Sequence, residues 1–138
     1  MDAFVQPLYE LADFDAIIRQ LKKPGIVQVS GCLDSQKAHF TNGLLREFPF
    51  RLIVAENDLK AKAFYEDFRL YDPEVLYYPA RDLIFYQADI HGNLLTRQRI
   101  QVLRALLERE EVTIVTSIDS CLDCLGPLAV WKEKVIKI

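Results

Sequence analysis

Short apolar runs alternate along the chain with longer stretches in which apolar residues recur every three or four positions. The short runs are rich in β-branched residues and predict strands, whereas the longer stretches predict helices. We expect five strands, over residues 26–30, 51–55, 75–78, 112–116 and 134–138. We expect five helical stretches, over residues 7–23, 36–48, 58–71, 96–108 and 118–124, and irregular chain over residues 79–95. Asp13 or Asp15 is expected to cap the second half of the first stretch, and Asn57 or Asp58 the start of the third.

The alternation of strands and helices predicts the fold class. Parallel strands need long crossover connections, and helices of this length supply them. The strand candidates are almost uniformly apolar, which is typical of strands buried on both faces. We therefore predict an α/β fold: one three-layer αβα domain with a mainly parallel sheet, covering residues 1–138. Because the chain stops inside an apparent strand, we expect it to be a fragment of a much longer protein.

Composition and charge narrow the function classes. The chain is 51% hydrophobic, enough for a sizeable core, and carries a net charge of -3. An acidic balance argues against wholesale electrostatic binding to nucleic acid, although it is compatible with a local basic patch. The N-terminus lacks the basic start and apolar run of a signal peptide, and no apolar stretch is long enough to span a membrane. We expect a cytoplasmic location and no membrane partner.

The three cysteines are Cys32, Cys121 and Cys124, and the last two form a C-x-x-C pair. An odd number in a chain of this size does not predict a disulfide framework. A structural zinc site needs four ligands, and the spacing of His39 and His91 matches no zinc module. We therefore predict no metal site, and we favour small buried side chains in a short last helix over a zinc site or a redox dithiol.

The most informative stretch lies between the first predicted strand and the following helix. A working phosphate loop has the pattern G-x-x-x-x-G-K-[ST] in this position. Gly31 and Lys37 have the required separation, but Gln36 replaces the second glycine and Ala38 replaces the hydroxyl residue. Gln36 puts a side chain where the backbone turns around the phosphates, and Ala38 lacks the hydroxyl that ligates magnesium. Asp34 adds a negative charge where an anion would sit.

This pattern predicts a degenerate phosphate loop that holds neither ATP nor magnesium. The alternative from the same residues is that Gly31 is a turn residue and Lys37 a solvated helix residue. Of the carboxylates near strand ends, Glu56, Asp58 and Asp119, the last two are explained more simply as helix N-caps than as catalytic groups. We therefore predict no catalytic residue and no cofactor for this segment.

A second informative stretch begins with the aromatic pair Tyr77 and Tyr78. It continues through the aromatic loop at residues 79–95, an Arg-x-Arg pattern at Arg97 and Arg99, a leucine-rich helix, and a strand that runs into Val-Thr-Ser-Ile-Asp-Ser-Cys. In this order the motifs resemble domain 1a of the UvrB-like module. That module opens the transcription-repair coupling factors and also forms the front of excinuclease subunit UvrB. The resemblance runs from about residue 10 to the end of the chain.

Two departures from UvrB favour the coupling-factor family. UvrB keeps an intact phosphate loop, and it carries a long aromatic β-hairpin for which residues 79–95 are too short. The resemblance implies a degenerate P-loop NTPase-like fold and a non-catalytic scaffold role in a DNA-repair translocase that displaces stalled RNA polymerase and recruits UvrA. It also implies that UvrA, RNA polymerase, ATP and magnesium bind parent domains outside this segment, which itself contacts other domains of the parent chain.

Direct contact with DNA is a further hypothesis, because arginines beside aromatic residues suit contact with a nucleic-acid backbone and its bases. The candidate strip contains Arg81, Arg97, Arg99 and Arg104, beside Phe85 and Tyr86. The alternative is a solvated helix face, balanced by glutamates at positions 108, 110 and 111, beside aromatic residues that pack in the core. The apolar face of that helix is expected to consist of Ile100, Leu103, Leu106 and Leu107.

Two other functions are compatible with the sequence. The first is an active nucleotide-binding UvrB-like repair domain, which binds ATP with magnesium. The second is a stand-alone α/β binding or redox module, whose redox form requires a reactive thiolate in the C-x-x-C pair.

Overall fold

The computed structural model describes residues 4–80, 89–123, 125 and 130. Its centre is a three-stranded, all-parallel sheet in the order β1-β3-β2, flanked by helices. The strands are β1 (Phe50–Ala55), β2 (Leu76–Tyr78) and β3 (Val112–Ser117). β3 pairs with β1 along its whole length and with β2 from Ile114 to Thr116. The predicted α/β class and the parallel pairing are therefore confirmed.

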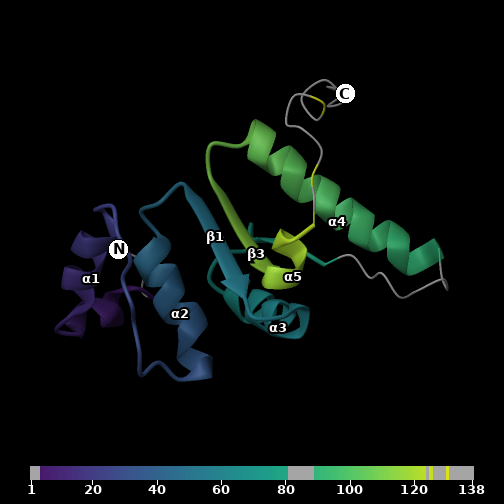
Figure 1. Ribbon diagram of the computed structural model, residues 1–138. Coiled ribbons are helices and arrows are strands. Elements are labelled where there is room, and N and C mark those ends of the chain that lie inside the picture. Colours follow the sequence, from purple (N-terminus) through teal and green to yellow (C-terminus); the bar gives the residue numbers. More distant parts are fainter. Residues whose placement is uncertain (1–3, 81–88, 124, 126–129, 131–138) are drawn as a thin grey trace.

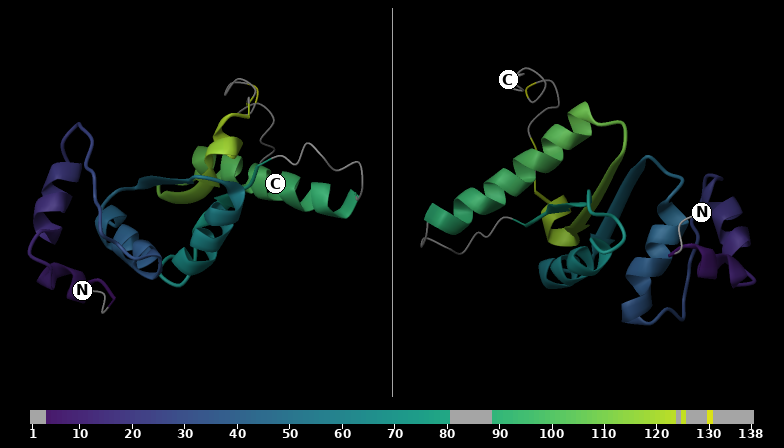
Figure 2. Two further views of the ribbon diagram at one scale, coloured as in Figure 1. Left: turned by 60° about the horizontal axis from the view of Figure 1, so that its bottom comes forward. Right: turned by 180° about the vertical axis from the view of Figure 1, so that it is seen from behind.

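Helices cover both faces of this sheet. The described helices are the 3-10 helix η1 (Gln6–Glu10), which packs with α1 (Phe14–Leu21) on α2, and then α2 (Asp34–Leu45), α3 (Asp58–Phe68), α4 (Asp89–Glu108) and α5 (Ile118–Cys121). The left view of Figure 2 shows the sheet nearly edge-on, with α4 on one side and with α2 and α3 together on the other. The crossovers β1–α3–β2 and β2–α4–β3 thus run over opposite faces.

Two apolar clusters hold these helices against the sheet. The cluster beneath α3 consists of Ala38, Ala61, Phe68, Val75, Tyr77 and Val115. The cluster beneath α4 consists of Tyr78, Val102, Ala105, Val112 and Ile114. Alternate residues of β3 enter different clusters, because successive side chains of a strand point to opposite faces. Every residue of β3 is buried, as expected for a central parallel strand covered on both sides.

β1 departs from this expectation. Phe50, Leu52 and Val54 share the face of the sheet that α4 covers elsewhere, yet they are 58%, 62% and 46% exposed. The cluster beneath α4 contains residues of β2 and β3 and none of β1 among the described residues. The predicted burial of the strands on both faces is therefore wrong for β1, because α4 lies over the other two strands.

The N-terminal helices pack on α2 rather than on the sheet. Their cluster consists of Val5, Leu8, Phe14 and Ile18, packed against Leu44. Figure 1 shows α1 on the far side of α2 from β1. The helical stretch predicted over residues 7–23 forms two helices, because an extended residue, Leu11, separates η1 from α1. Asp13, one of the two predicted caps of the second half, takes the N-cap position of α1, although its side chain makes no capping hydrogen bond. The break lets both pieces turn their apolar side chains toward α2.

The strand predicted over residues 26–30 is also wrong in this structure. Residues 26–33 have no regular secondary structure, and Ile26 and Val29 are 99% and 42% exposed. A strand requires a hydrogen-bonded neighbour, and a β-branched composition by itself supplies none. The described sheet ends at β1, and the segment runs outside it (Figure 1).

Other predicted boundaries shift by a few residues. α4 begins at Asp89, so residues 89–95 are helical rather than irregular. α2 and α5 end at Leu45 and Cys121, both earlier than predicted. The strand predicted over residues 134–138 lies outside the described residues. Within the described part of the chain, none of the helices is both long and apolar enough to cross a membrane.

Candidate functional site

The predicted phosphate loop lies at the N-terminus of α2. Gly31 has a positive φ of 90°, and the helix begins at Asp34. Lys37 Nζ lies 2.6 Å from Asp34 Oδ1, so the two side chains form an ion pair within the first helical turn. The hydrogen bond from Lys37, and then its charge, lower the pKa of the Asp34 carboxyl. The lysine that a working loop directs at phosphate is thus directed at a carboxylate of the same loop.

The two replaced positions are held by contacts within the protein. Gln36 Oε1 accepts a hydrogen bond from the Leu33 backbone N–H at 3.4 Å, so its side chain folds back over the start of the helix. Ala38 is 3% exposed and belongs to the cluster beneath α3. A hydroxyl at that position would enter apolar packing, where an unsatisfied polar group is costly. The position that ligates magnesium in working loops is therefore a core position here.

The strand that usually precedes a phosphate loop is also missing. A phosphate loop connects a buried strand to a helix, and the strand fixes where the backbone N–H groups of the loop point. α2 supplies the helix, but residues 26–33 are irregular. The described residues around Gly31 therefore form no preorganised cradle for a triphosphate.

Polar groups at the carboxyl ends of the strands bond to the protein itself, although α/β folds usually bind ligands at this edge. The Asn57 side chain accepts a hydrogen bond from the Lys60 backbone N–H at 2.9 Å. Asp58 Oδ1 accepts one from the Ala80 backbone N–H at 3.1 Å. Glu56 forms an ion pair with Lys60. These carboxylates therefore serve local structure.

One of the two N-caps predicted for α3, Asn57, is confirmed, and the N-cap predicted for α5 is not. Asn57 caps α3 and Ser117 caps α5, each accepting a hydrogen bond from a backbone N–H three residues later. Asp58 and Asp119 lie one or two positions inside these helices, in the first turn. A carboxylate in the first turn interacts favourably with the positive end of the helix dipole. The prediction that the two aspartates are N-caps is wrong, although their role remains local and structural.

The arginines of the predicted basic strip do not share one face. Arg97 and Arg104 are exposed, and Arg104 Nε donates to Glu108 Oε2 at 2.9 Å. Arg99 is only 6% exposed. It follows Arg97 by two residues, which is about 200° around an α-helix, so the two side chains point to opposite sides of α4. Arg81, Phe85 and Tyr86 lie outside the described residues.

Arg99 is the centre of a buried contact at the end of β2. Its Nη1 donates to the Pro79 carbonyl and to Asp123 Oδ2, each at 2.8 Å. Its guanidinium carbon lies 4.2 Å from the centroid of the Tyr78 ring. Arg99 thereby fixes α4 to the end of β2 and to the residues that follow α5. The sequence offered no signal for this contact, since Asp123 is distant along the chain.

The buried face of α4 is rotated relative to the predicted one. It consists of Arg99, Val102 and Ala105. Ile100 and Leu106, expected inside, are 50% and 44% exposed. Small side chains at the contact let the helix lie close over β2 and β3, and larger ones would hold it away.

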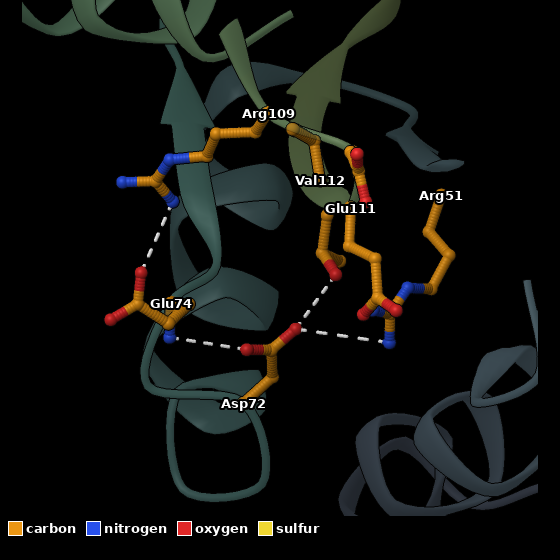
Figure 3. Close-up of a pocket in the computed structure, with 8 residues that line it drawn as sticks. Arg51, Asp72, Glu74, Arg109, Glu111 and Val112 are labelled. Atoms are coloured by element: carbon orange, nitrogen blue, oxygen red, sulfur yellow. Dashed lines mark hydrogen bonds and ion pairs between the residues drawn. The ribbon is translucent and has the colours of Figure 1, made fainter. Parts of the chain in front are cut away.

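A charged depression lies at the opposite, amino end of the strands. It has a volume of about 430 Å³ and is lined mainly by Arg51, Asp72, Glu74, Arg109, Glu111 and Thr113. Asp72 accepts a hydrogen bond from the Thr113 hydroxyl at 2.7 Å and lies 3.9 Å from Arg51 Nη1 (Figure 3). Glu74 bonds Arg109 at 3.1 Å. Two arginines face four carboxylates here, because Glu110 also lines the depression, so its charge is negative overall. The ion pairs connect the α3–β2 turn to the start of β3.

The described cysteines are free thiols that do not converge on a centre. Cys32 is half-buried, and Cys121 is exposed, so the predicted burial of Cys121 is wrong. Among the described residues, no three potential ligands are close enough to hold a metal ion. Cys124 lies outside the described residues, and the C-x-x-C pair is therefore not seen as a pair.

Comparisons with known proteins leave the family open. The chain matches no protein-family model, and a search of the curated proteins finds no match either. Its function must be argued from the residues and contacts described above.

Proposed function

We propose that this chain is a non-catalytic scaffold domain of a transcription-coupled DNA-repair translocase. In this proposal it has the degenerate P-loop NTPase-like, three-layer fold of domain 1a in the coupling-factor family that its motifs resemble. The observation that carries the non-catalytic part is the phosphate loop, in which Lys37 pairs with Asp34 and Ala38 packs in the core. The motor, UvrA and RNA polymerase belong to other domains of the parent chain.

The charge balance of the loop supports the absence of ATP binding. The Lys37–Asp34 pair is exposed, so solvent screens it and Lys37 is able to leave it. Asp34 would nevertheless stay beside a bound phosphate, where two negative charges repel. Ala38 offers no oxygen to magnesium, whose charge neutralises the phosphates in working loops. The obstacles are thus the added acid and the missing metal ligand, more than the occupied lysine.

The exposed apolar face of β1 supports the proposed role as a scaffold. Phe50, Leu52 and Val54 lie in alternate positions of one strand and are all about half exposed or more. Contiguous exposed apolar residues on a soluble domain are typical of contact surfaces. In this proposal, other domains of the parent chain cover them.

Calorimetric titration with ATP and magnesium tests the non-catalytic role. We expect no binding heat from the wild-type chain, and an intact phosphate-loop ATPase serves as the positive control. The Lys37→Met variant distinguishes loop binding from adventitious binding. Micromolar, magnesium-dependent binding that Lys37→Met abolishes would overturn the proposal and favour an active UvrB-like domain.

A repair assay tests the cellular role. Lesions in a transcribed strand and in its complement are followed in the source cells, with and without the gene that encodes this chain. We expect that loss of the gene removes the faster repair of the transcribed strand and leaves the other strand unchanged. Unchanged repair of both strands contradicts a role in transcription-coupled repair.

The redox alternative makes a separate prediction. A catalytic dithiol requires a thiolate of lowered pKa, which alkylates rapidly at neutral pH. The alkylation rate of Cys121 is measured against pH by mass spectrometry of the modified peptide, and rapid alkylation at neutral pH would favour the redox alternative.

A further inference from the structure

α4 has a second apolar face besides the one that packs on the sheet. Ile100, Leu103 and Leu107 follow one another by three and four residues, so they form one stripe along the helix, which we name the outer stripe. Val102 and Ala105 are the residues of α4 that enter the cluster beneath it. The centre of the outer stripe lies about 160° around the helix from the midpoint between these two, so it points away from the sheet.

The outer stripe is uncovered in the described part of the fold. Ile100 is 50% exposed, and the half-buried Leu103 and Leu107 pack against none of the three apolar clusters. Among the described elements, α4 packs on β2 and β3 and makes no extensive contact with another helix. Figure 1 and Figure 2 show α4 along the outer boundary of the fold. A helix with apolar residues on two sides is typical of a helix that is covered on both.

The spacing of the outer stripe indicates that its partner is a helix. Thr96 precedes Ile100 by four residues, so positions 96, 100, 103 and 107 are separated by four, three and four residues. This is the repeat that keeps the apolar residues of one helix facing a second helix in a coiled coil. The four positions extend over about 17 Å, since each residue of an α-helix rises about 1.5 Å. So short a seam predicts a weak, transient contact.

Two exposed arginines border the outer stripe on one side. Arg97 and Arg104 are seven residues apart, so they occupy equivalent positions beside the seam in successive repeats. Arg104 bonds Glu108 at the surface, where such a pair is weak, and Arg97 has no ion pair among the described residues. Both guanidinium groups are therefore able to bond a partner. A helix that lies along the outer stripe meets them with the residues that flank its own seam, and carboxylates there are complementary.

The same charges disfavour a second copy of the chain as the partner. In an antiparallel pair of α4 helices, the two flanks that bear Arg97 and Arg104 meet, so arginines face arginines and repel. In a parallel pair, this flank meets the opposite flank of the other copy. That flank carries Arg99 and Leu106 and offers no carboxylate beside the outer stripe. The partner is therefore a different, acidic helix.

We propose that the outer stripe of α4 is the docking site for an acidic amphipathic helix of a partner protein. Apolar residues of that helix pack on Ile100, Leu103 and Leu107 and supply the affinity, whereas its flanking carboxylates bond Arg97 and Arg104 and supply the selectivity. The inference does not rest on the proposed function. Neither ATP titration nor the repair assay tests it.

A matched pair of synthetic peptides tests the docking. Both peptides repeat the same leucine seam over three heptads, but one has glutamate on both flanks and the other has lysine. Like charges on the flanks keep each peptide from pairing with itself. Binding of each labelled peptide to the full chain is measured by fluorescence anisotropy at low salt. We expect the glutamate peptide to bind at least about tenfold more tightly than the lysine peptide, and this preference to shrink as the salt concentration rises.

Variants of α4 locate the binding surface. Ile100→Gln combined with Leu103→Gln should weaken binding of the glutamate peptide by about tenfold or more, because the apolar seam is lost. Arg97→Glu combined with Arg104→Glu should reverse the preference, so that the lysine peptide binds more tightly. This gain of binding also shows that the charge-reversed chain is folded. The control is Leu94→Gln, which should leave binding unchanged, because Leu94 is 55% exposed on α4 but lies about 150° around the helix from the outer stripe.

Three results would overturn the proposal. The first is equal affinity for the two peptides, or no binding of the glutamate peptide at about 1 mM. The second is an equal loss of binding in Leu94→Gln, which would indicate unspecific apolar adsorption. The third is a dimer of the chain in sedimentation that Ile100→Gln with Leu103→Gln dissociates, since the partner of the outer stripe would then be a second copy.

Discussion

Replacing Arg99 by methionine tests whether this arginine stabilises the fold through buried contacts or belongs to an exposed basic surface. Methionine keeps the apolar stem but removes the charge that bonds Pro79 and Asp123 and lies over the Tyr78 ring. Removing one partner of a buried ion pair costs about 3–5 kcal/mol, because the other charge is left without compensation. Asp123 is 24% exposed, so water partly solvates the remaining carboxylate. The expected loss is therefore near the lower end, about 3 kcal/mol.

Urea unfolding followed by circular dichroism measures this loss. The free energy of unfolding of such a domain is about 5–15 kcal/mol. The expected loss therefore lowers the urea concentration at the unfolding midpoint by much more than the experimental error. Arg97→Met is the matched control, because Arg97 lies on the same helix and is exposed. We expect the control to change the unfolding free energy by less than about 0.5 kcal/mol. A second variant, Asp123→Asn, closes a double-mutant cycle and should give a coupling energy of about 1–3 kcal/mol with Arg99→Met.

A loss below about 1 kcal/mol for Arg99→Met would refute the reasoning, since a buried arginine cannot be removed so easily if its contacts persist in solution. Weakened DNA binding by Arg99→Met with unchanged stability would also refute it. That result would place the guanidinium on the surface and restore Arg99 to a basic strip with Arg97.

Two further predictions concern the phosphate loop. Ala38→Thr should lower the free energy of unfolding, measured in urea, by about 1–3 kcal/mol, because it adds a methyl and a hydroxyl to a packed position. The control is Ala63→Thr, on the exposed face of α3, which should change this free energy little. Lys37→Met should raise the pKa of the Asp34 carboxyl toward its ordinary value of 3.8, as measured by NMR titration, and an unchanged pKa would mean that the pair does not form in solution. Because pairing lowers the folded-state pKa, its contribution to stability is present above pH 3.8 and is lost as the pH falls through the lowered value.

The sequence by itself determined the elements whose causes are local. β1 and β3 are short apolar runs between polar breaks, and Lys22 ends α1 ahead of Pro24 and Gly25 as the pattern indicated. The faults of the phosphate loop are also visible in the sequence, because a missing hydroxyl or glycine is a property of the residue itself. Parallel pairing followed from the length of the connecting helices.

Only the tertiary structure decided which segments have partners. Residues 26–30 have a strand composition but remain unpaired, since a ladder depends on a neighbour that composition does not specify. Arg99 looks like a surface charge along the chain, yet Asp123 and the Tyr78 ring bury it. The face of α4 that enters the core is likewise set by how closely Val102 and Ala105 approach the sheet. Burial and pairing are relations between distant segments, and the pattern along one segment does not contain them.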